Sequence, residues 1–244
     1  MLATESVSST AQRPESEAIV VVPIRSFASA KTRLSTIFDD VERRAIAEFL
    51  AWQVVTAAPT RSVVISGDDE VLKWAQALSA ETLRDDSSLD RAATVGAEFA
   101  YRLGAARTII SHADLVGPVD FSPHVTVTDQ TALTPCRHGT GSNVISFPSA
   151  DIPRFAYGKD SARRHLDLWA SQGRDTTIVS ADGLAFDLDT DFDWFYLTPE
   201  QVERIVSGAG LDGSVETWRE GFDRSHGLAR RQTSANRRSQ LEER

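Results

Sequence analysis

Short apolar runs alternate with amphipathic segments along the first half of the chain. Residues 18–24 read Ala-Ile-Val-Val-Val-Pro-Ile, and such a continuous β-branched run predicts a strand covered on both faces. Apolar side chains within 41–58 recur at helical spacing behind an aspartate cap, and Pro59 ends the segment. The alternation predicts further strands at 61–66, 81–84 and 106–114 and helices at 68–79 and 88–103. This β-α-β order predicts an α/β fold.

The pattern changes after Asp114. The nine residues that separate it from His124 leave no room for a full crossover helix, so we expect this part of the sheet to be mixed rather than parallel. Strands are predicted at 124–129, 143–147, 176–180 and 183–190, and helices at 160–172 and 193–207. The expected architecture is therefore a central mixed, mostly parallel sheet flanked by helices.

The length and composition suit one sizeable α/β domain or two small ones. The chain has 244 residues, of which 41% are hydrophobic and 25% are charged, and this suffices for a real core. We expect a disordered N-terminal tail at 1–17, a folded domain at 18–207 and a partly disordered extension at 208–244. Within the extension, one amphipathic turn is predicted around Val215, Trp218 and Phe222.

Charge and cysteine content exclude several classes of protein. The formal net charge of −9 and the pI near 5.1 argue against nucleic acid or an anionic membrane as the main partner. The single cysteine, Cys136, excludes an intramolecular disulfide, and we interpret it as a small buried side chain rather than a nucleophile. Residues 1–17 lack the apolar run of a signal peptide, and no stretch is long enough to span a bilayer. We therefore expect a soluble cytoplasmic protein.

Two aspartates occupy alternate positions of the last predicted strand. Side chains alternate between faces along a strand, so the apolar residues of 183–190 face a core while Asp187 and Asp189 share the opposite face. Neighbouring carboxylates are poorly tolerated without a positive charge between them, and such oxygen pairs suit Mg²⁺ or Mn²⁺. The alternative is a strand end that runs into a helix cap, because Asp191 and Asp193 follow and aspartate is a common N-cap residue.

A cationic loop follows the first predicted strand and contains Arg25, Lys31 and Arg33. It lacks the glycines of a phosphate-binding P-loop, so side-chain cations rather than backbone amides would have to meet a phosphate. A solvated basic loop explains the same residues. Asp114 ends the fourth predicted strand, at the edge where open α/β sheets bind ligands.

Two further segments suit an anion. Residues 138–143, His-Gly-Thr-Gly-Ser-Asn, allow close backbone approach, although the same sequence suits a hairpin turn. Residues 157–161, Tyr-Gly-Lys-Asp-Ser, open a predicted helix whose N-terminus favours negative charge, and a plain N-cap by Asp160 is the alternative. We interpret His165, on the same helical face as Ser161, as a packing residue.

The candidate residues together indicate one kind of chemistry. The sequence has no Ser-His-Asp order and no metal spacing of the H-E-x-x-H or C-x-x-C kind. What it has are cations after the first strand, a carboxylate after the fourth, a small-residue loop, an anion-ready helix start and a carboxylate pair. A nucleotidyltransferase typically has cationic side chains that contact the triphosphate. Carboxylates on the opposite side of the site hold a divalent metal.

Five segments carry a resemblance to one family. They are Val-Pro-Ile-Arg-Ser-Phe-Ala-Ser-Ala-Lys-Thr-Arg-Leu at 22–34, Ala-Asp-Leu at 113–115, Gly-Thr-Gly-Ser-Asn at 139–143, Tyr-Gly-Lys-Asp-Ser-Ala-Arg-Arg-His at 157–165 and Leu-Ala-Phe-Asp-Leu-Asp-Thr at 184–190. In these segments the chain resembles the CofC/FbiD family, guanylyltransferases of the biosynthesis of the deazaflavin coenzyme F(420). The resemblance implies a three-layer, Rossmann-like nucleotidyltransferase fold of the GT-A-like kind. It also implies that GTP and 2-phospholactate, phosphoenolpyruvate or 3-phosphoglycerate give a guanylylated acid and pyrophosphate.

The resemblance implies roles for residues on the nucleotide side. Lys31 would neutralise the phosphates of GTP with Arg33 in support, and both would act in catalysis together with Asp114. Leu89 and Asp90 would contribute to the nucleotide site.

The resemblance also implies a metal site and an acceptor site. Mg²⁺ or Mn²⁺ would be held by Asp114, Asp187 and Asp189, and the acid's phosphate and carboxylate would be bound by Ser142, Gly158 and Ser161. The expected protein partners are the downstream transferase of the same pathway or a second copy of the chain. The alternatives are a nucleotidyltransferase with another nucleotide or acceptor, and an inactive homologue that binds a nucleotide or a partner.

The chain departs from the family pattern at three places. Asp-Leu-Val-Gly-Pro at 114–118 replaces the family's Asp-Leu-Pro, and we expect the helix that follows in the family to be deleted. Ser-Leu-Asp at 88–90 stands where the family has Gly-Leu-Asn, and a further segment follows residue 207.

Overall fold

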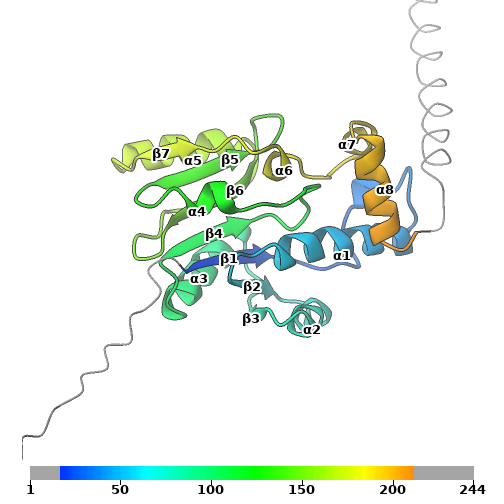
Figure 1. The fold of residues 1–244 in the computed structure, drawn as a ribbon, viewed down its shortest axis with the longest axis horizontal. Helices are drawn as coiled ribbons and strands as arrows, with labels where there is room; N and C mark the ends of the chain where they lie inside the picture. The colour runs from blue at the N-terminus through cyan, green and yellow to red at the C-terminus, as the bar shows by residue number, and fades with distance from the viewer. Residues whose placement is uncertain (1–16, 212–244) are drawn as a thin grey trace, which may run out of the picture.

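Residues 17–211 are described by the computed structural model, and they form one seven-stranded sheet with helices on both faces (Figure 1). The strand order is β3-β2-β1-β4-β6-β5-β7. The strands are β1 (Ala18–Pro23), β2 (Arg61–Ser66), β3 (Glu81–Arg84), β4 (Arg107–Ser111), β5 (Thr131–Pro135), β6 (Ser142–Pro148) and β7 (Thr176–Ile178). The helices are α1 (Asp40–Thr56), α2 (Asp69–Ala77), α3 (Leu89–Arg102), α4 (Ser122–Val125), α5 (Ser161–Ser171), α6 (Asp182–Ala185), α7 (Asp191–Phe195) and α8 (Pro199–Gly208).

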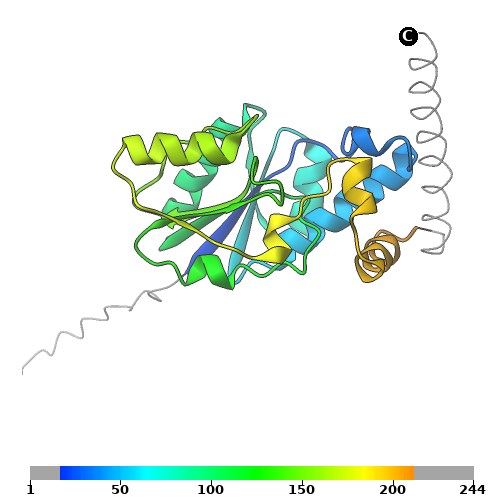
Figure 2. The ribbon, with the colours of Figure 1, turned by 90° about the horizontal axis from the view of Figure 1, so that it is seen from above.

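The half of the sheet formed by β3, β2, β1 and β4 is parallel and buried. β1 pairs in parallel with β2 and β4, and β2 pairs in parallel with β3, as the β-α-β pattern predicts. Val20 and Val22 of β1 belong to the core shared with α1 and α2, whereas Ile19 and Val21 belong to the core shared with α3 and α5. Because β1 is covered on both faces, its sequence is a continuous apolar run. Figure 2 shows the resulting three layers, with α4 and α5 on opposite sides of the sheet.

Helix α3 lies unusually close to this half of the sheet. A Cβ atom on Gly96 would lie 2.5 Å from the Val21 side chain and 2.3 Å from the Ile65 side chain. A larger residue at this position would push α3 away from the strands. The first turn of α3 contributes to the cavity described below, so this contact also sets one wall of the cavity.

The remaining strands make the sheet mixed. β6 is antiparallel to β4 and to β5, while β7 is parallel to β5. The expected strands at 143–147 and 176–180 correspond to β6 and β7. In the described chain, the one-turn helix α4 is the only helix between β4 and β5, as the expected deletion after Asp114 requires. The prediction of a mixed, mostly parallel sheet is therefore confirmed.

The prediction of a strand at 124–129 is wrong. This segment begins inside α4 and continues as a loop that leads to β5. The buried ring of His124 lies 2.8 Å from the hydroxyls of Ser146 and Thr134. The guanidinium of Arg107 donates to two carbonyl oxygens of the segment and to that of Gln130, just after it. These partners come from other strands, so the local alternation of apolar and polar residues does not reveal them.

The prediction of a strand at 183–190 is also wrong. The segment begins in α6 and continues as extended chain, with an isolated antiparallel bridge between Leu115 and Asp187. The amide of Leu188 donates to the carbonyl oxygen of Asp114 at 3.1 Å. The segment therefore pairs with the loop after β4 instead of joining the sheet, and the amide of Val116 in turn donates to the carbonyl oxygen of Phe186 at 2.7 Å.

The helix predicted at 193–207 is two helices. α7 ends at Phe195, and α8 begins at Pro199 after a cap in which Thr198 Oγ1 accepts from the amide of Gln201 at 3.3 Å. Proline suits the first turn of a helix but not its interior, so the segment divides there.

Parts of the expected tail and extension lie outside the described residues. Of the predicted tail at 1–17, only Glu17 is described, and the predicted turn around Val215, Trp218 and Phe222 lies outside the described range. None of the helices within 17–211 is long and apolar enough to cross a membrane.

Candidate active site

A cavity of about 790 Å³ opens at the carboxyl ends of β1, β2, β3 and β4. Its walls come from the loop after β1, the loops that join β2 to α2 and β3 to α3, and the residues that follow β4. Open α/β sheets bind their ligands at this edge, and the volume is that of a small-molecule site. The cavity is therefore the first candidate for an active site.

Lys31 joins the loop after β1 to the end of β4. Its Nζ lies 2.6 Å from Asp114 Oδ2 and 3.6 Å from Asp189 Oδ1, and its side chain is 7% exposed. The backbone of Lys31 has a φ of 56°, in the left-handed region that is uncommon for residues other than glycine, and a 3-10 turn at Thr32–Leu34 follows. Such a conformation persists only where the surroundings fix it, and here two carboxylates hold the ammonium group. The structure thus brings together three of the predicted site residues.

Asp114 stays ionised in spite of its burial. Desolvation disfavours the charged form, but the Lys31 ammonium and the His112 imidazole outweigh it and hold the pKa of Asp114 below its ordinary value. Oδ2 accepts from Lys31, whereas Oδ1 is buried and has no hydrogen-bond partner within residues 17–211. A buried carboxylate oxygen without a partner is unfavourable, so this atom is suited to receive a ligand.

Asp187 and Asp189 add negative charge beside Asp114. Burial, and then the charge of Asp114, raise the pKa of both carboxyls. Asp187 Oδ1 accepts from Asn143 Nδ2 at 3.1 Å, while the side chain of Asp189 is about half exposed. Because the neighbouring carboxylates repel one another, a cation bound between them would stabilise their ionised forms.

The chemistry of these carboxylates suits Mg²⁺ or Mn²⁺, because both ions prefer carboxylate oxygens. Beside the free Oδ1 of Asp114, the buried Oδ1 of Asn143 also lacks a partner in the described chain. As arranged here, however, the described residues contain no group of three or more His, Cys, Asp or Glu side chains that could hold a metal ion. Lys31 Nζ instead neutralises Asp114 and Asp189, so metal binding requires these side chains to move relative to one another.

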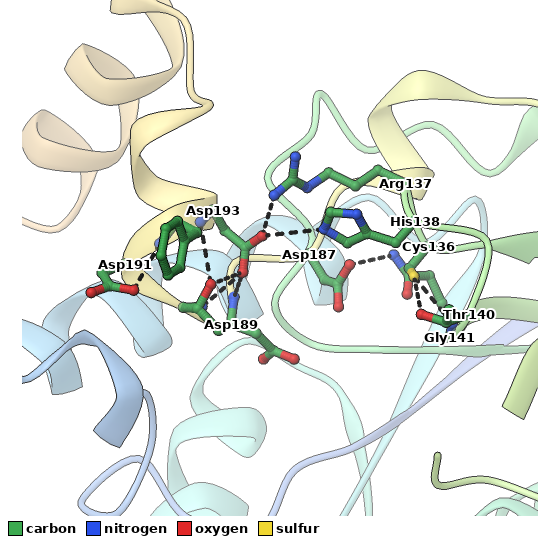
Figure 3. A network of polar contacts seen from close by, with 12 residues as sticks. Cys136, Arg137, His138, Thr140, Gly141, Asp187, Asp189, Asp191 and Asp193 are labelled. Carbon is green, nitrogen blue, oxygen red and sulfur yellow. Dashed lines mark hydrogen bonds and ion pairs between the residues drawn. The ribbon is translucent and has the colours of Figure 1, made fainter. Parts of the chain in front are cut away.

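A polar network holds the aspartate segment, residues 187–190, which carries Asp187 and Asp189 (Figure 3). Asp193 Oδ2 accepts hydrogen bonds from the backbone amides of Asp189 at 3.1 Å and Thr190 at 2.7 Å. Asp193 Oδ1 pairs with Arg137, which belongs to the turn between β5 and β6. Burial disfavours ionisation of Asp193, but the bonds from Arg137 and Thr190 outweigh it and lower the pKa of this carboxyl. The turn and the aspartate segment are therefore fixed to each other.

The side chain of Arg137 is itself held in place by aromatic rings. Its guanidinium lies 4.7 Å from the ring centroid of Phe186 and 4.5 Å from that of Tyr196. Cysteine 136, next to it, is buried and accepts a hydrogen bond from the amide of Gly141 through its sulfur at 3.1 Å, as a small packing residue does. Residues 136–141 thus form the hairpin turn that was one of the two alternatives for this loop.

The residues expected to bind the acid do not line the cavity in the described chain. The amide of Ser142 donates to Ser161 Oγ at 3.0 Å, and Ser142 Oγ lies 2.9 Å from His165 Nδ1. Gly158 has a φ of 116° and lies just before α5. The structure brings the two serines together, but their hydroxyls are buried and engaged within the protein. Arg33 is exposed and also lies outside the cavity wall.

His165 is buried and packs against the rings of Tyr157 and Trp169, as predicted. Its Nε2 accepts from the amide of Ala156 at 2.8 Å, so the proton resides on Nδ1 and is donated to Ser142. Burial lowers the pKa of His165 to about 4. Asp160 occupies the N-cap position of α5 with a φ of 55°, yet its side chain makes no capping hydrogen bond among the described residues.

Leu89 and Asp90, the two residues of α3 that are expected to contribute to the nucleotide site, differ in their position relative to the cavity. Leu89 lines the cavity, whereas Asp90 Oδ1 accepts from the amide of Tyr157 at 2.7 Å. Ser88, which replaces the family's glycine, caps α3 by accepting from the amide of Arg91 at 3.3 Å. Asp90 therefore holds the backbone of Tyr157 and does not itself line the cavity.

The sequence did not indicate a role in the site for three residues that the structure places in or beside the cavity. His112 and Tyr157 line the cavity, and Arg137 supports the aspartate segment. His112 precedes Asp114 by two residues and Tyr157 adjoins Gly158, so proximity to predicted residues was the available signal. Arg137 gave no signal, because its partner Asp193 lies 56 residues away in the sequence.

A mixed, three-layer α/β fold with a cation and carboxylates at the carboxyl ends of its strands fits a nucleotidyltransferase, and the family match and the relatives show that this chain is an enzyme of that class. Residues 18–198 match the family model described as "Guanylyl transferase CofC like". Because the match spans most of the chain, the protein belongs to this family.

Curated relatives have consistent names. A phosphoenolpyruvate guanylyltransferase from Sphaerobacter thermophilus is 31% identical over 208 residues, which cover 81% of this chain and 97% of the relative. A 2-phospho-L-lactate guanylyltransferase from Methanothermobacter thermautotrophicus is 28% identical over 70% of this chain and 79% of its own length.

Solved structures share the fold. A protein from Desulfovibrio desulfuricans G20, described as a nucleotide-diphospho-sugar transferase, superposes with a TM-score of 0.63 at 15% identity, covering 85% of this chain and 96% of that one. A nucleotidyl transferase from Methanothermobacter superposes with a TM-score of 0.53 at 12% identity, covering 77% and 98%. The predicted fold class is confirmed.

Proposed function

We propose that this protein is a Mg²⁺-dependent guanylyltransferase that joins GTP to a small phosphorylated carboxylic acid and releases pyrophosphate. The observation that carries the proposal is Lys31, held between Asp114 and Asp189 at the edge of a cavity of nucleotide size. The names of the relatives support phosphoenolpyruvate and 2-phospholactate as acceptors, and 3-phosphoglycerate is the third candidate acid. The product would serve the biosynthesis of the deazaflavin coenzyme F(420).

The reaction does not require a general base from the protein. A phosphate oxygen of the acid attacks the α-phosphorus of GTP and forms a new P–O bond. The bond from the α-phosphorus to the oxygen that bridges to the β-phosphate breaks, and its electron pair leaves with pyrophosphate. Because the attacking phosphate is already ionised, the tasks left to the protein are positioning and charge neutralisation.

The side chains of the cavity can perform these tasks. The ammonium of Lys31 neutralises phosphate oxygens when it exchanges its carboxylate partners for the triphosphate. Asp114, Asp187 and Asp189 would hold the metal, which supplies positive charge to the phosphates when it is bound. Leu89 offers an apolar contact on the nucleotide side.

A panel assay tests the proposal against its alternatives. The purified chain is incubated with each nucleoside triphosphate, Mg²⁺ and each of the three acids, and pyrophosphate release is measured. Release with GTP and one of these acids supports the proposal. Release only with another nucleotide or acceptor indicates a different nucleotidyltransferase. No release under any condition contradicts both readings and indicates an inactive homologue that binds a nucleotide or partner.

A further inference from the structure

Three residues of the cavity wall carry a buried polar atom that has no hydrogen-bond partner within residues 17–211. These atoms are Asp114 Oδ1, His112 Nε2 and the hydroxyl of Tyr157. Native proteins pair nearly all buried polar atoms, so unpaired atoms gathered in one cavity indicate that a ligand completes them. The proposed metal accounts for Asp114 and leaves the Tyr157 hydroxyl without a role.

The position of Tyr157 is fixed by contacts other than its hydroxyl. Its backbone amide donates to Asp90 Oδ1 at 2.7 Å, and its carbonyl oxygen accepts from Arg164 Nη1 at 3.0 Å. Its ring meets the ring of His165 edge to face at a centroid distance of 4.9 Å and stacks against Phe155 at 6.0 Å. The residue is 8% exposed. The protein therefore holds the hydroxyl in place without using it.

The hydroxyl is available as a hydrogen-bond donor. Burial, with a smaller contribution from the charge of Asp90, raises the pKa of Tyr157 well above its ordinary value, so the group stays protonated. A neutral phenol donates its proton to an oxygen that accepts a hydrogen bond, and an anionic oxygen forms the stronger bond.

Tyr157 lies beside the segments that are expected to bind the acid. Its ring lies 5.9 Å from that of His112, whose Nδ1 is 4.0 Å from Asp114 Oδ1. Behind the ring, His165 connects to Ser142, and Gly158 is the next residue in the chain. Tyr157 thus lies between the carboxylates and the segments that are expected to hold the acid.

We propose that the Tyr157 hydroxyl donates a hydrogen bond to an anionic oxygen, phosphoryl or carboxylate, of the acceptor acid. The inference rests on the proposed guanylyltransferase function. Tyr157 is then a substrate-binding residue in addition to those expected from the sequence, and it acts on the acid rather than on the nucleotide.

Tyr157→Phe tests this assignment, because it removes the hydroxyl and keeps the ring. We expect the KM for the acid to rise about tenfold, as expected for one hydrogen bond to a charged group, while the KM for GTP changes less than twofold. The thermal unfolding midpoint should not fall, because the hydroxyl makes no bond in the folded chain. Tyr101→Phe, on the exposed face of α3, is the matched control and should change neither constant.

A binding measurement separates this inference from the proposed function. Phosphoenolpyruvate is titrated calorimetrically into wild type and Tyr157→Phe in the presence of α,β-methylene-GTP, which cannot transfer its guanylyl group. About tenfold weaker binding by the variant supports the inference. Equal binding, a change confined to GTP, or a loss of stability without a change in binding overturns it and leaves the proposed function standing. Wild type that neither binds nor turns over any of the acids overturns both.

Discussion

The β3-β2-β1-β4 half of the sheet and the β6-β5-β7 half are held together by different kinds of contact. In the first half, strands such as β1 are apolar on both faces and helices pack directly on them, as α3 does at Gly96. In the second half, buried polar side chains connect the strands: His124 lies within hydrogen-bond distance of Ser146 and Thr134, and the side chain of Arg107 reaches into this network from the neighbouring strand β4. Apolar packing builds the cavity walls, whereas specific hydrogen bonds position the chain that supports the site.

The aspartate segment depends on the second kind of contact. Asp187 accepts from Asn143 of β6, and the backbone of Asp189 is held by Asp193, which pairs with Arg137 from the turn after β5. Asp114 and Lys31 come from the first half. The site is therefore assembled where the two halves meet, and variants of each half should fail in different ways.

The largest effect is expected from Asp187→Asn. Loss of one carboxylate should lower kcat about 10³-fold, because the phosphates lose part of their counter-charge. The fold should persist with an unchanged or higher unfolding midpoint, since burial and repulsion by Asp114 raise the pKa of Asp187 and removal of its charge relieves that repulsion. Pyrophosphate release and thermal unfolding measure the two effects. Asp182→Asn, at an exposed position of α6, is the control; wild-type turnover in Asp187→Asn would refute the metal role.

Arg107→Met should destabilise the second half strongly. The buried guanidinium donates to three carbonyl oxygens and to Ser146 Oγ, and the substitution removes all four of these hydrogen bonds, although Ser146 Oγ keeps His124 as a partner. We expect the free energy of unfolding to fall by about 4 kcal/mol in denaturant titrations. Ile65→Val in the apolar half should cost only about 1 kcal/mol. Equal costs for the two variants would contradict the contrast between the halves.

Acidification should also weaken the second half. Burial lowers the pKa of His165 from 6.5 to about 4, so the unfolded chain binds a proton that the folded chain does not bind. The stability contributed by neutral His165 is complete above pH 6.5 and is lost as the pH falls toward 4, by about 3 kcal/mol. Unfolding titrations across this range should show a flatter pH dependence for His165→Gln, whereas His138→Gln should keep the wild-type slope. Parallel profiles for all three proteins would count against the role of His165.

A smaller effect is expected from Asp193→Asn, which weakens the support of Asp189 without touching the cavity. The Mg²⁺ concentration for half-maximal activity should rise about tenfold, because the aspartate segment is less well positioned. Binding of Mn²⁺, followed by electron paramagnetic resonance, should weaken to a similar extent. Asp191→Asn is a matched control, because that exposed carboxylate accepts from Thr36 Oγ1 at 3.3 Å and from the amide of Phe192 at 2.9 Å rather than from the backbone of Asp189. Identical metal dependence of the two variants would show that Asp193 does not position the site.

The same difference between the halves explains how much of the fold follows from the sequence. The β-α-β half was predicted nearly residue by residue, because its signals are local: apolar runs, helical periodicity and capping aspartates. The strand β5 was missed and a strand was placed at 124–129, since the partners of His124 and Arg107 are remote in sequence. The segment 183–190 has the alternation of a strand but pairs with the loop after β4.

The sequence also predicted part of the candidate site, namely which residues lie near one another, but not the hydrogen bonds that their side chains make. The resemblance implied that Lys31, Asp114 and Asp189 belong to one site, and the structure brings the three side chains together. Ser142 and Ser161 were correctly brought near each other, but their hydroxyls point to partners within the protein. A sequence shows that a hydroxyl exists, but only the packing around it shows which atoms it meets.

The central claim is that the carboxylates beside Lys31 bind a divalent cation together with GTP. Titration of Mn²⁺ into the full chain with α,β-methylene-GTP, followed by electron paramagnetic resonance, tests it directly. We predict a tight Mn²⁺ site that requires the nucleotide in the wild type and is lost in Asp114→Asn. Equal Mn²⁺ binding by wild type and Asp114→Asn would contradict the claim.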